Sequence, residues 1–325
     1  MRGALVLLAT MAVAIAPAQT PARVTVNVFP GGFNWPSFVA QEKGFFERNG
    51  IVVTLQPTPN SVAQMTGLAE GRFDIAITAV DNIVAYVEGQ GEAPIGPQSE
   101  FFAFMGSDSG FLSLVVAPDI RRFADLKGKI LSVDARTTGY AFVLFDVLRR
   151  NGLTLDKDYG VERAGGMTQR WDALRQGKQA GTLLSTPFNI LAKEQRFNQL
   201  AQAIDVIGPY QGNVAATRRS WARENRAKVI GFIRAYAQAI DWLYDTANRD
   251  EAIAILSKNV AMSPVLAARS YDELLDPKNG FFRKARISVD GLRTVLALRT
   301  RYGRGAILTE PAKYYDPTYY DAAMR

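Results

Sequence analysis

Histidine and cysteine are both absent from this 325-residue sequence, which removes the side chains that most often do chemistry at neutral pH. Without cysteine there is no thiol nucleophile, no thiolate metal ligand and no disulfide. Without histidine the chain lacks the commonest general base and the commonest metal ligand. Carboxylates, lysines, tyrosines and serines remain, but no two carboxylates stand out as an acid–base pair. The composition therefore favours a binding protein over an enzyme, and it predicts neither a metal nor a cofactor.

Two glycine-rich segments resemble catalytic motifs but fail on their spacing. Residues 89–94 (GQGEAP) begin like a dinucleotide-binding loop and then end in proline. Residues 106–110 (GSDSG) lack the G-x-S-x-G spacing of a nucleophile elbow, and no histidine could complete a triad. A phosphate-binding G-x-x-x-x-G-K-S/T loop is also absent, so we do not expect this chain to hydrolyse ATP.

Arg136, Thr137, Thr138 and Gly139 lie where a predicted strand (residues 130–133) gives way to an amphipathic helix. The backbone N–H groups at a helix N-terminus are unpaired, so with the helix dipole and two hydroxyls they can hold a carboxylate or sulfonate. Arg136 can add a bidentate contact to that anion, or it can point into solvent. An ordinary N-cap explains the same residues, so the sequence leaves both roles open.

Apolar strands alternate with amphipathic helices from Val24 onward. Predicted strands lie at residues 24–29, 51–55, 73–78, 111–118, 130–133, 158–164 and 181–185. Predicted helices lie at residues 36–44, 60–71, 81–89 and 168–177, in addition to the helix that follows Gly139. Repetition of strand, helix and strand with short connections implies mostly parallel sheets with helices on both faces.

The α/β part of the sequence contains two similar units. Residues 68–77 and 174–183 each combine a helix end, a helix-stopping glycine and a strand three residues later. This similarity predicts two α/β lobes, although a common helix-to-strand junction would give the same pattern by convergence. From about Ser220 the chain is predicted to be mostly helical, with helices at residues 220–245, 249–260, 264–275 and 288–301.

Residues 1–18 have the layout of a secretory signal peptide. Arg2 is followed by an apolar stretch (residues 4–16) and by small residues that suit cleavage near Ala18. The stretch is shorter than the about 20 residues that a membrane span needs, and there is no cysteine for lipid attachment. We expect a cleaved, free protein in a bacterial periplasm that is not a lipoprotein; an uncleaved anchor is the alternative.

The net charge of +7 does not indicate a nucleic-acid-binding protein. Lysine and arginine are scattered along the chain, and no segment combines a basic face with stacking aromatic residues. The excess positive charge is instead consistent with a mild preference for anionic partners.

Five segments, in their order and spacing, resemble the periplasmic solute-binding proteins of ABC importers. The group to which they are similar includes binders of alkanesulfonates, taurine, nitrate and the pyrimidine precursor of thiamine. The segments are residues 40–55, 67–77, 123–133, 148–159 and 171–177, within a similarity that spans most of residues 24–210. The family usually has an acidic residue where Ala180 stands, and this departure predicts a structural difference in the second lobe.

This resemblance implies a type II periplasmic-binding-protein fold, in which two α/β lobes joined by two hinge crossings enclose a ligand. It implies an ABC permease and an ATPase subunit as partners, and we expect a monomer. The boundaries that follow are residues 24–107 with 214–325 for lobe 1, residues 113–207 for lobe 2, and residues 108–112 and 208–213 for the crossings.

Ligands of open parallel sheets bind beyond the carboxyl ends of the strands, and this rule selects the candidate ligand-binding residues. In the first lobe they are Phe33, Asn34, Trp35, Ser61, Thr78, Asp81 and Asn82. In the second lobe and the second crossing they are Arg136, Thr137, Thr138, Gly139, Met167, Thr186, Phe188, Tyr210 and Asn213. Some have plain structural alternatives, since Trp35 can pack in the core and Ser61 and Asp81 can lie in helix caps.

The leading functional hypothesis is a receptor that captures a small organic, anionic solute and delivers it to a permease. A heteroaromatic, pyrimidine-type ligand is the second hypothesis, given Phe33, Trp35 and Phe188. A thiamine-pyrimidine synthase-like enzyme of similar fold is disfavoured, because that reaction, as the family is understood, consumes a histidine. A secreted sensor that signals through a partner receptor remains open.

Overall fold

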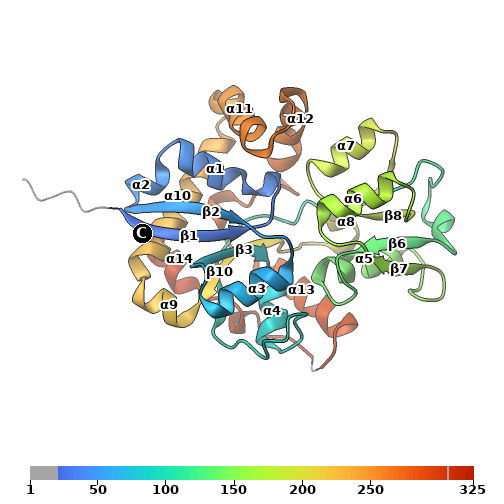
Figure 1. Cartoon of the computed structure of the whole chain (residues 1–325), viewed down its shortest axis with the longest axis horizontal. Helices are drawn as coiled ribbons and strands as arrows, with labels where there is room; N and C mark the ends of the chain where they lie inside the picture. Colours follow the sequence, from blue (N-terminus) through green and yellow to red (C-terminus); the bar gives the residue numbers. More distant parts are fainter. Residues whose placement is uncertain (1–20, 306) are drawn as a thin grey trace, which may run out of the picture.

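The computed structural model describes residues 21–305 and 307–325. The chain forms two lobes, each built on a five-stranded sheet, and Figure 1 shows them side by side. The predicted signal peptide, residues 1–18, lies outside the described residues. Among the described residues no single helix has the length and apolar character of a membrane span; residues 246–260 and 264–274 meet that test only as a pair bent by 111°.

The sheet of the first lobe has the strand order β2-β1-β3-β10-β4. Its strands are β1 (Ala22–Val28), β2 (Ile51–Pro57), β3 (Ile75–Ala79), β4 (Phe101–Gly106) and β10 (Asn213–Arg218). The helices of this lobe are α1 (Trp35–Glu42), α2 (Phe45–Arg48), α3 (Ser61–Glu70), α4 (Val80–Val87), α9 (Arg219–Glu224), α10 (Arg226–Tyr244), α11 (Arg249–Val260), α12 (Pro264–Leu274), α13 (Val289–Tyr302) and α14 (Pro317–Ala323).

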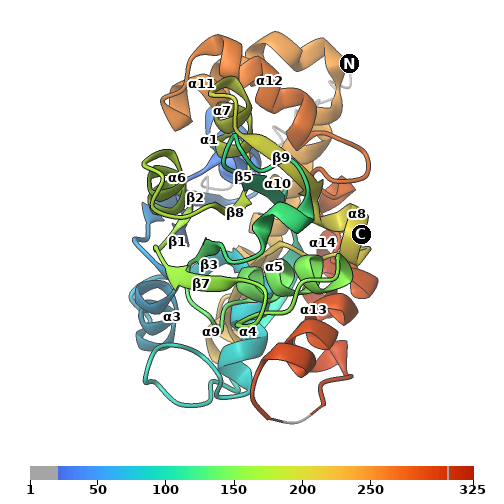
Figure 2. The same ribbon diagram turned by 90° about the vertical axis from the view of Figure 1, so that its right-hand side faces the viewer.

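The sheet of the second lobe has the order β7-β6-β8-β5-β9. Its strands are β5 (Ser113–Val116), β6 (Ile130–Val133), β7 (Gly160–Arg163), β8 (Gly181–Leu184) and β9 (Asn198–Gln202). Its helices are α5 (Gly139–Arg150), α6 (Met167–Arg175), α7 (Phe188–Glu194) and α8 (Ala203–Ile207). Two helix pairs join the lobes, because α12 contacts α7 and α13 contacts α5; the turned view in Figure 2 shows α11 and α12 above α7.

Both sheets are mixed, whereas the sequence predicted mostly parallel ones. Strand β1 pairs in parallel with β2 and β3, and β6 pairs in parallel with β7 and β8. Every antiparallel pairing between strands of the two sheets involves β5 or β10. These two strands each follow a crossing between the lobes, so the strand–helix repeat that indicated parallel pairing does not extend to them.

Local sequence signals place the ends of several helices. The Asn60 side chain accepts a hydrogen bond from the Ala63 N–H (2.9 Å) at the start of α3, and Gly71, with a φ of 71°, ends that helix. The predicted helix at residues 220–245 is instead two helices, α9 and α10. They meet at Asn225, whose non-helical backbone (φ −117°, ψ 34°) separates the two helices. The apolar pattern of the sequence continues across this break and therefore does not reveal it.

The two crossings, residues 107–112 and 208–212, lie against each other. The fully buried carboxylate of Asp108 accepts hydrogen bonds from the backbone N–H groups of Gly110 (2.8 Å) and Asn213 (3.1 Å). A Cβ on Gly212 would lie 2.2 Å from the Gly110 nitrogen, so only glycine permits this approach. Burial raises the pKa of the Asp108 carboxyl in spite of its hydrogen bonds.

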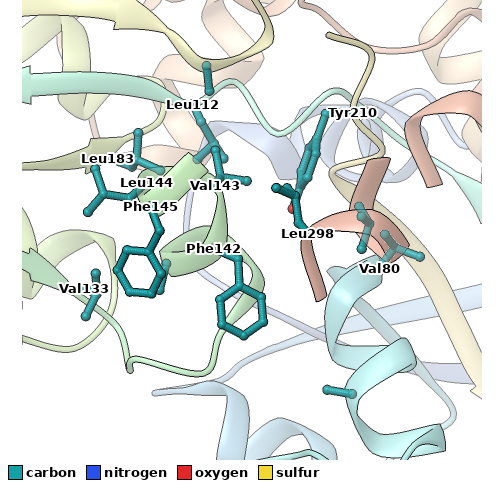
Figure 3. Close-up of a cluster of buried hydrophobic side chains, with 14 of the residues drawn as sticks. Val80, Leu112, Val133, Phe142, Val143, Leu144, Phe145, Leu183, Tyr210 and Leu298 are labelled. Carbon is teal, nitrogen blue, oxygen red and sulfur yellow. The ribbon is translucent and has the colours of Figure 1, made fainter. Parts of the chain in front are cut away.

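One hydrophobic cluster extends through both lobes. Figure 3 shows Phe142, Phe145 and Val143 of α5 together with Val80 of α4 and Leu298 of α13. The residues that the two lobes contribute to this cluster have similarly low exposed fractions. The lobes therefore share apolar core as well as polar contacts.

Candidate functional site

A cavity of about 210 Å³ lies between the lobes, at the carboxyl ends of strands from both sheets. The first lobe contributes Phe29, Pro30, Phe33, Thr58, Pro59, Ser61, Ala79, Asn82 and Asn213. The second lobe contributes Asp134, Thr138, Gly139, Tyr140, Gly166, Met167, Thr168, Gln169, Arg170 and Ser185, and the first crossing contributes Gly110. The lining combines apolar rings with hydroxyl, amide and charged groups, as small-molecule sites do.

A second hollow of about 320 Å³ also lies between the lobes, but its polar groups already pair with one another. Glu273 accepts hydrogen bonds from Thr186 (2.9 Å) and Asn189 (2.6 Å), and Lys278 pairs with Asp205. These contacts hold α12 and the following loop against the second lobe. We therefore assign the ligand site to the smaller cavity, where polar groups remain without protein partners.

Arg170 is the cavity residue whose environment is most unusual. It lies in the first turn of α6 and is only 4% exposed. One terminal nitrogen donates to the Leu183 carbonyl (2.9 Å) and the other contacts the Met167 sulfur (3.1 Å). Within the described chain, its Nε has no hydrogen-bond acceptor and no carboxylate forms an ion pair with it.

Desolvation lowers the pKa of Arg170, and the nearby charge of Asp134 opposes that effect only in part. Because an arginine keeps its proton in proteins, the guanidinium remains a buried cation that, among the described residues, feels the charge of Asp134 but forms no ion pair with it. Leaving such a charge unpaired is costly, and an anion in the cavity would remove that cost. The arrangement is therefore suited to binding a negatively charged group.

Seven of the sixteen predicted site residues line the cavity: Phe33, Ser61, Asn82, Thr138, Gly139, Met167 and Asn213. Asn82 is oriented by a hydrogen bond from its amide to the Thr78 hydroxyl (2.8 Å). Thr78 is itself fully buried, so its hydroxyl holds the Asn82 side chain in a fixed orientation. The Asn213 amide donates to Asp108, which ties one wall of the cavity to the crossings.

Asn34 and Trp35 lie behind the cavity wall. The Asn34 amide donates to the Phe29 carbonyl (2.6 Å) and holds the turn that presents Phe29 and Phe33. The Trp35 indole is fully buried, donates to the Ala252 carbonyl (3.0 Å) and packs edge-on against Tyr271. Trp35 is thus a core residue, which was one of the two roles that the sequence allowed.

Arg136 and Thr137 also lie away from the cavity. Arg136 is half exposed and pairs with Asp156 through both terminal nitrogens (3.2 and 2.5 Å). The Thr137 hydroxyl donates to Glu92, and its carbonyl accepts from Arg299 (3.0 Å). The segment that suggested an anion site therefore contacts the first lobe through Thr137 and the cavity through Thr138 and Gly139.

Asp81 forms a buried ion pair with Arg299 of α13, with distances of 2.7 and 2.5 Å. Burial by itself would lower the pKa of Arg299, but the charge and hydrogen bonds of Asp81 outweigh burial, so the pKa is raised. Gly139 packs directly on this pair, since a Cβ there would lie 2.4 Å from the Asp81 Cβ. Asp81 is therefore part of the contact between the lobes, outside the cavity.

Three other predicted residues also lie outside the cavity. Thr186 is buried and donates to Glu273, whereas Phe188 packs beside the core that contains Trp171. Tyr210 is buried in the shared core, and its ring centroid is 6.5 Å from that of Tyr140, which does line the cavity. Burial raises the pKa of Tyr210 well above its usual value, so its hydroxyl stays protonated.

Sequence reasoning missed Arg170, Asp134 and Tyr140. Asp134 follows β6 directly, so the rule about strand ends would have selected it together with Arg136. Arg170 lies three residues after Met167, on the same side of the first turn of α6. The rule about strand ends selects the loop and the first residues of the next helix, so it selected Met167 but did not extend to Arg170.

Two known proteins are similar to this chain in sequence. YtlA of Bacillus subtilis (strain 168) is 25% identical over 241 residues, which cover 72% of this chain and 68% of YtlA. The bicarbonate transport ATP-binding protein CmpC of Synechococcus elongatus is 25% identical over 68% of this chain, but the matched region is only 35% of CmpC.

Two solved structures with low sequence identity have the same fold. The ligand-binding component of an ABC-type import system from Staphylococcus aureus, with zinc bound, has a TM-score of 0.75 at 14% identity, covering 93% of this chain and 99% of its own. The alkanesulfonate-binding protein SsuA from Xanthomonas axonopodis pv. citri, bound to MOPS, has a TM-score of 0.73 at 17% identity, covering 92% and 100%. At these identities the likeness shows the fold, which is that of two-lobed periplasmic binding proteins. The sequence model of the NMT1-like family matches residues 17–257, more than half of the chain, and the chain therefore belongs to the NMT1-like family.

Proposed function

We propose that this protein is the solute-binding receptor of an ABC importer, and that it captures a small organic anion in the cavity between its lobes. The observation that carries this proposal is the unpaired, buried Arg170 guanidinium in a cavity lined by both sheets. A group that contacts both walls stabilises the closed arrangement by its differential affinity for it. The volume of about 210 Å³ is below the about 300 Å³ at which pockets for larger ligands begin, which suits a small solute.

Movement about the two crossings would admit and release the solute. Gly110 (φ 91°) and Gly208 (φ 86°) adopt left-handed backbone conformations within the crossings, where small residues can absorb changes in backbone angle. We infer that residues 107–112 and 208–212 are the hinge, with lobe boundaries close to those expected from the sequence. The closed receptor would dock on a membrane permease that a separate ATPase drives.

The partners and the location are inferred from relatives. The Staphylococcus aureus neighbour is a component of an ABC-type import system, and the CmpC relative is a transport ATP-binding protein. These names support a permease and an ATPase as partners, and the signal-like residues 1–18 support export to a periplasm. We propose a monomeric receptor. We also propose that it binds its solute without enzymatic activity, because the sequence has neither histidine nor cysteine.

A heteroaromatic solute is the second candidate, because three aromatic rings line the cavity. Phe29, Phe33 and Tyr140 can stack on a planar ligand. Such a ligand would not neutralise the charge of Arg170 unless it also carried an acidic group. For that reason we rank it second. An enzyme resembling a thiamine-pyrimidine synthase is ranked below both, since the sequence has no histidine.

Thermal-shift screening of the purified protein with sulfonates, carboxylates, amino acids and pyrimidines tests the ligand class. A ligand at 100 times its Kd stabilises the protein by about 2.7 kcal/mol. Calorimetric titration of any hit should then show an at least roughly tenfold weaker affinity for Arg170→Gln, because hydrogen bonds to a charged group contribute about 1.5–3 kcal/mol. Arg136→Gln is the matched control and should bind like the wild type. Binding of neutral pyrimidines alone, or unchanged affinity in Arg170→Gln, would contradict the proposal for an anionic ligand.

A further inference from the structure

The cavity contains a second charged group that a simple anion does not explain. Asp134 lines the cavity on the same lobe as Arg170, directly after β6. In the part of the chain that the structure describes, its carboxylate takes part in no ion pair and no side-chain hydrogen bond. Asp134 nevertheless acts on Arg170, since its charge opposes the lowering of the Arg170 pKa.

Asp134 and Arg170 are the formally charged residues of the cavity lining, and their charges cancel. The lining is therefore neutral overall and carries one charge of each sign. A simple anion would pair with Arg170 but would bring its negative charge close to Asp134, which is unfavourable. A ligand that carries a negative and a positive group could pair with Arg170 and with Asp134 at the same time.

We propose that the solute is a small zwitterion, whose anionic group binds Arg170 and whose ammonium group binds Asp134. This inference rests on the proposed receptor function and narrows the class of its ligand. Asp134 is then the residue that selects amino-bearing anions over plain ones. The rings of Phe29, Phe33 and Tyr140 enclose the carbon skeleton and, at short range, favour a cation.

Matched pairs of probes separate this inference from the proposed function. The pairs are 3-aminopropanesulfonate with propanesulfonate, and 3-aminopropanoate with propanoate, titrated calorimetrically into the full-length protein after removal of bound ligand. In the wild type we expect each amino compound to bind about tenfold or more tightly than its plain partner. Binding of the plain anions reports the anion site, and the ratio within each pair reports the role of Asp134.

Three variants complete the test. Asp134→Asn should abolish the preference for the amino compounds and improve the binding of the plain anions, because the repulsion is gone. Arg170→Gln should weaken all four probes. Asp156→Asn, at an exposed carboxylate that pairs with Arg136, should leave every affinity unchanged.

The outcomes distinguish the two claims. If the plain anions bind the wild type as tightly as the amino compounds, or if Asp134→Asn keeps the preference, the zwitterion inference fails and the anion receptor stands. If none of the four probes binds at millimolar concentration, both claims fail, because a site built on these two charges must accept the smallest molecules that carry them. Circular dichroism and thermal melting confirm that each variant is folded.

Discussion

Of two buried arginines in this protein, one has a carboxylate partner and the other does not. Arg299 is 2% exposed and forms two hydrogen bonds with Asp81, whereas Arg170 is 4% exposed and has no such partner among the described residues. A buried ion pair whose two charges neutralise each other indicates a structural role. An unpaired buried charge beside a cavity indicates a group kept for a ligand.

The two arginines should therefore respond differently to replacement by methionine. Arg299→Met leaves the Asp81 carboxylate buried without a cation, so the free energy of unfolding should fall by about 3–5 kcal/mol. Arg170→Met removes a charge that burial penalises, but it also removes the hydrogen bond to the Leu183 carbonyl. Because these two effects oppose each other, the free energy of unfolding of the ligand-free protein should change by less than about 1 kcal/mol. Urea unfolding of both variants without ligand measures the difference; equal losses would show that Arg170 is as structural as Arg299.

Asp108 should make the free energy of unfolding fall as the pH rises. An aspartate in an unfolded chain titrates near about 3.9, and burial raises the pKa of Asp108 above that in the folded protein. The folded state then retains a proton that the unfolded chain has lost, so the contribution of Asp108 is full below the unfolded pKa and is lost as pH rises through the folded pKa. Asp108→Asn does not titrate and keeps one oxygen acceptor for Gly110 and Asn213.

We expect the free energy of unfolding of the wild type, relative to Asp108→Asn, to fall as the pH rises above about 4. Comparing the two proteins cancels the other titrating groups. Chemical unfolding at a series of pH values measures this difference, and a difference that is constant with pH would disagree with a raised pKa.

At the scale of elements, α4 and α5 are in close contact where the two lobes meet. Gly139 starts α5 and lies against Asp81 at the start of α4. An added Cβ would lie 2.4 and 2.5 Å from the Cβ and Cγ of Asp81, so one element must move away. The same contact includes the bond from Arg299 to the Thr137 carbonyl, which spans the two lobes.

Gly139→Ala should therefore hold the lobes apart. We expect weaker ligand binding and, by small-angle X-ray scattering, a larger radius of gyration in the presence of ligand than for the wild type. Gly160→Ala in the same lobe is the control, because its Cβ would meet only the end of the flexible Ile130 side chain (2.7 Å). Wild-type affinity and compaction in Gly139→Ala would mean that this contact does not limit closure.

The elements themselves were largely predictable, and the contacts between them were not. Apolar periodicity placed α11 at residues 249–260, as observed, because its buried face repeats at helical spacing. The rule about strand ends located the cavity wall at Asn82, Thr138 and Met167. It could not show that Arg136 pairs with Asp156, since that pairing depends on how a loop is packed.

At the scale of the molecule, the shared core couples the two lobes. The cluster that contains Val80, Phe142 and Leu298 joins α4, α5 and α13, so neither lobe can unfold without exposing apolar surface of the other. We expect a single cooperative transition in differential scanning calorimetry, with equal calorimetric and van't Hoff enthalpies. Two separated transitions would show that the lobes are independent.

The close contact of the crossings also restricts how the lobes can move. Two separate flexible links would let the lobes bend, twist and slide relative to each other. Here the links are joined by the Asp108 hydrogen bonds and by the fit of Gly212 against Gly110. If these crossings are the hinge that we propose, they must turn together about one axis, and each opening and closing should then bring Asp134 and Arg170 back to the same position relative to Phe33.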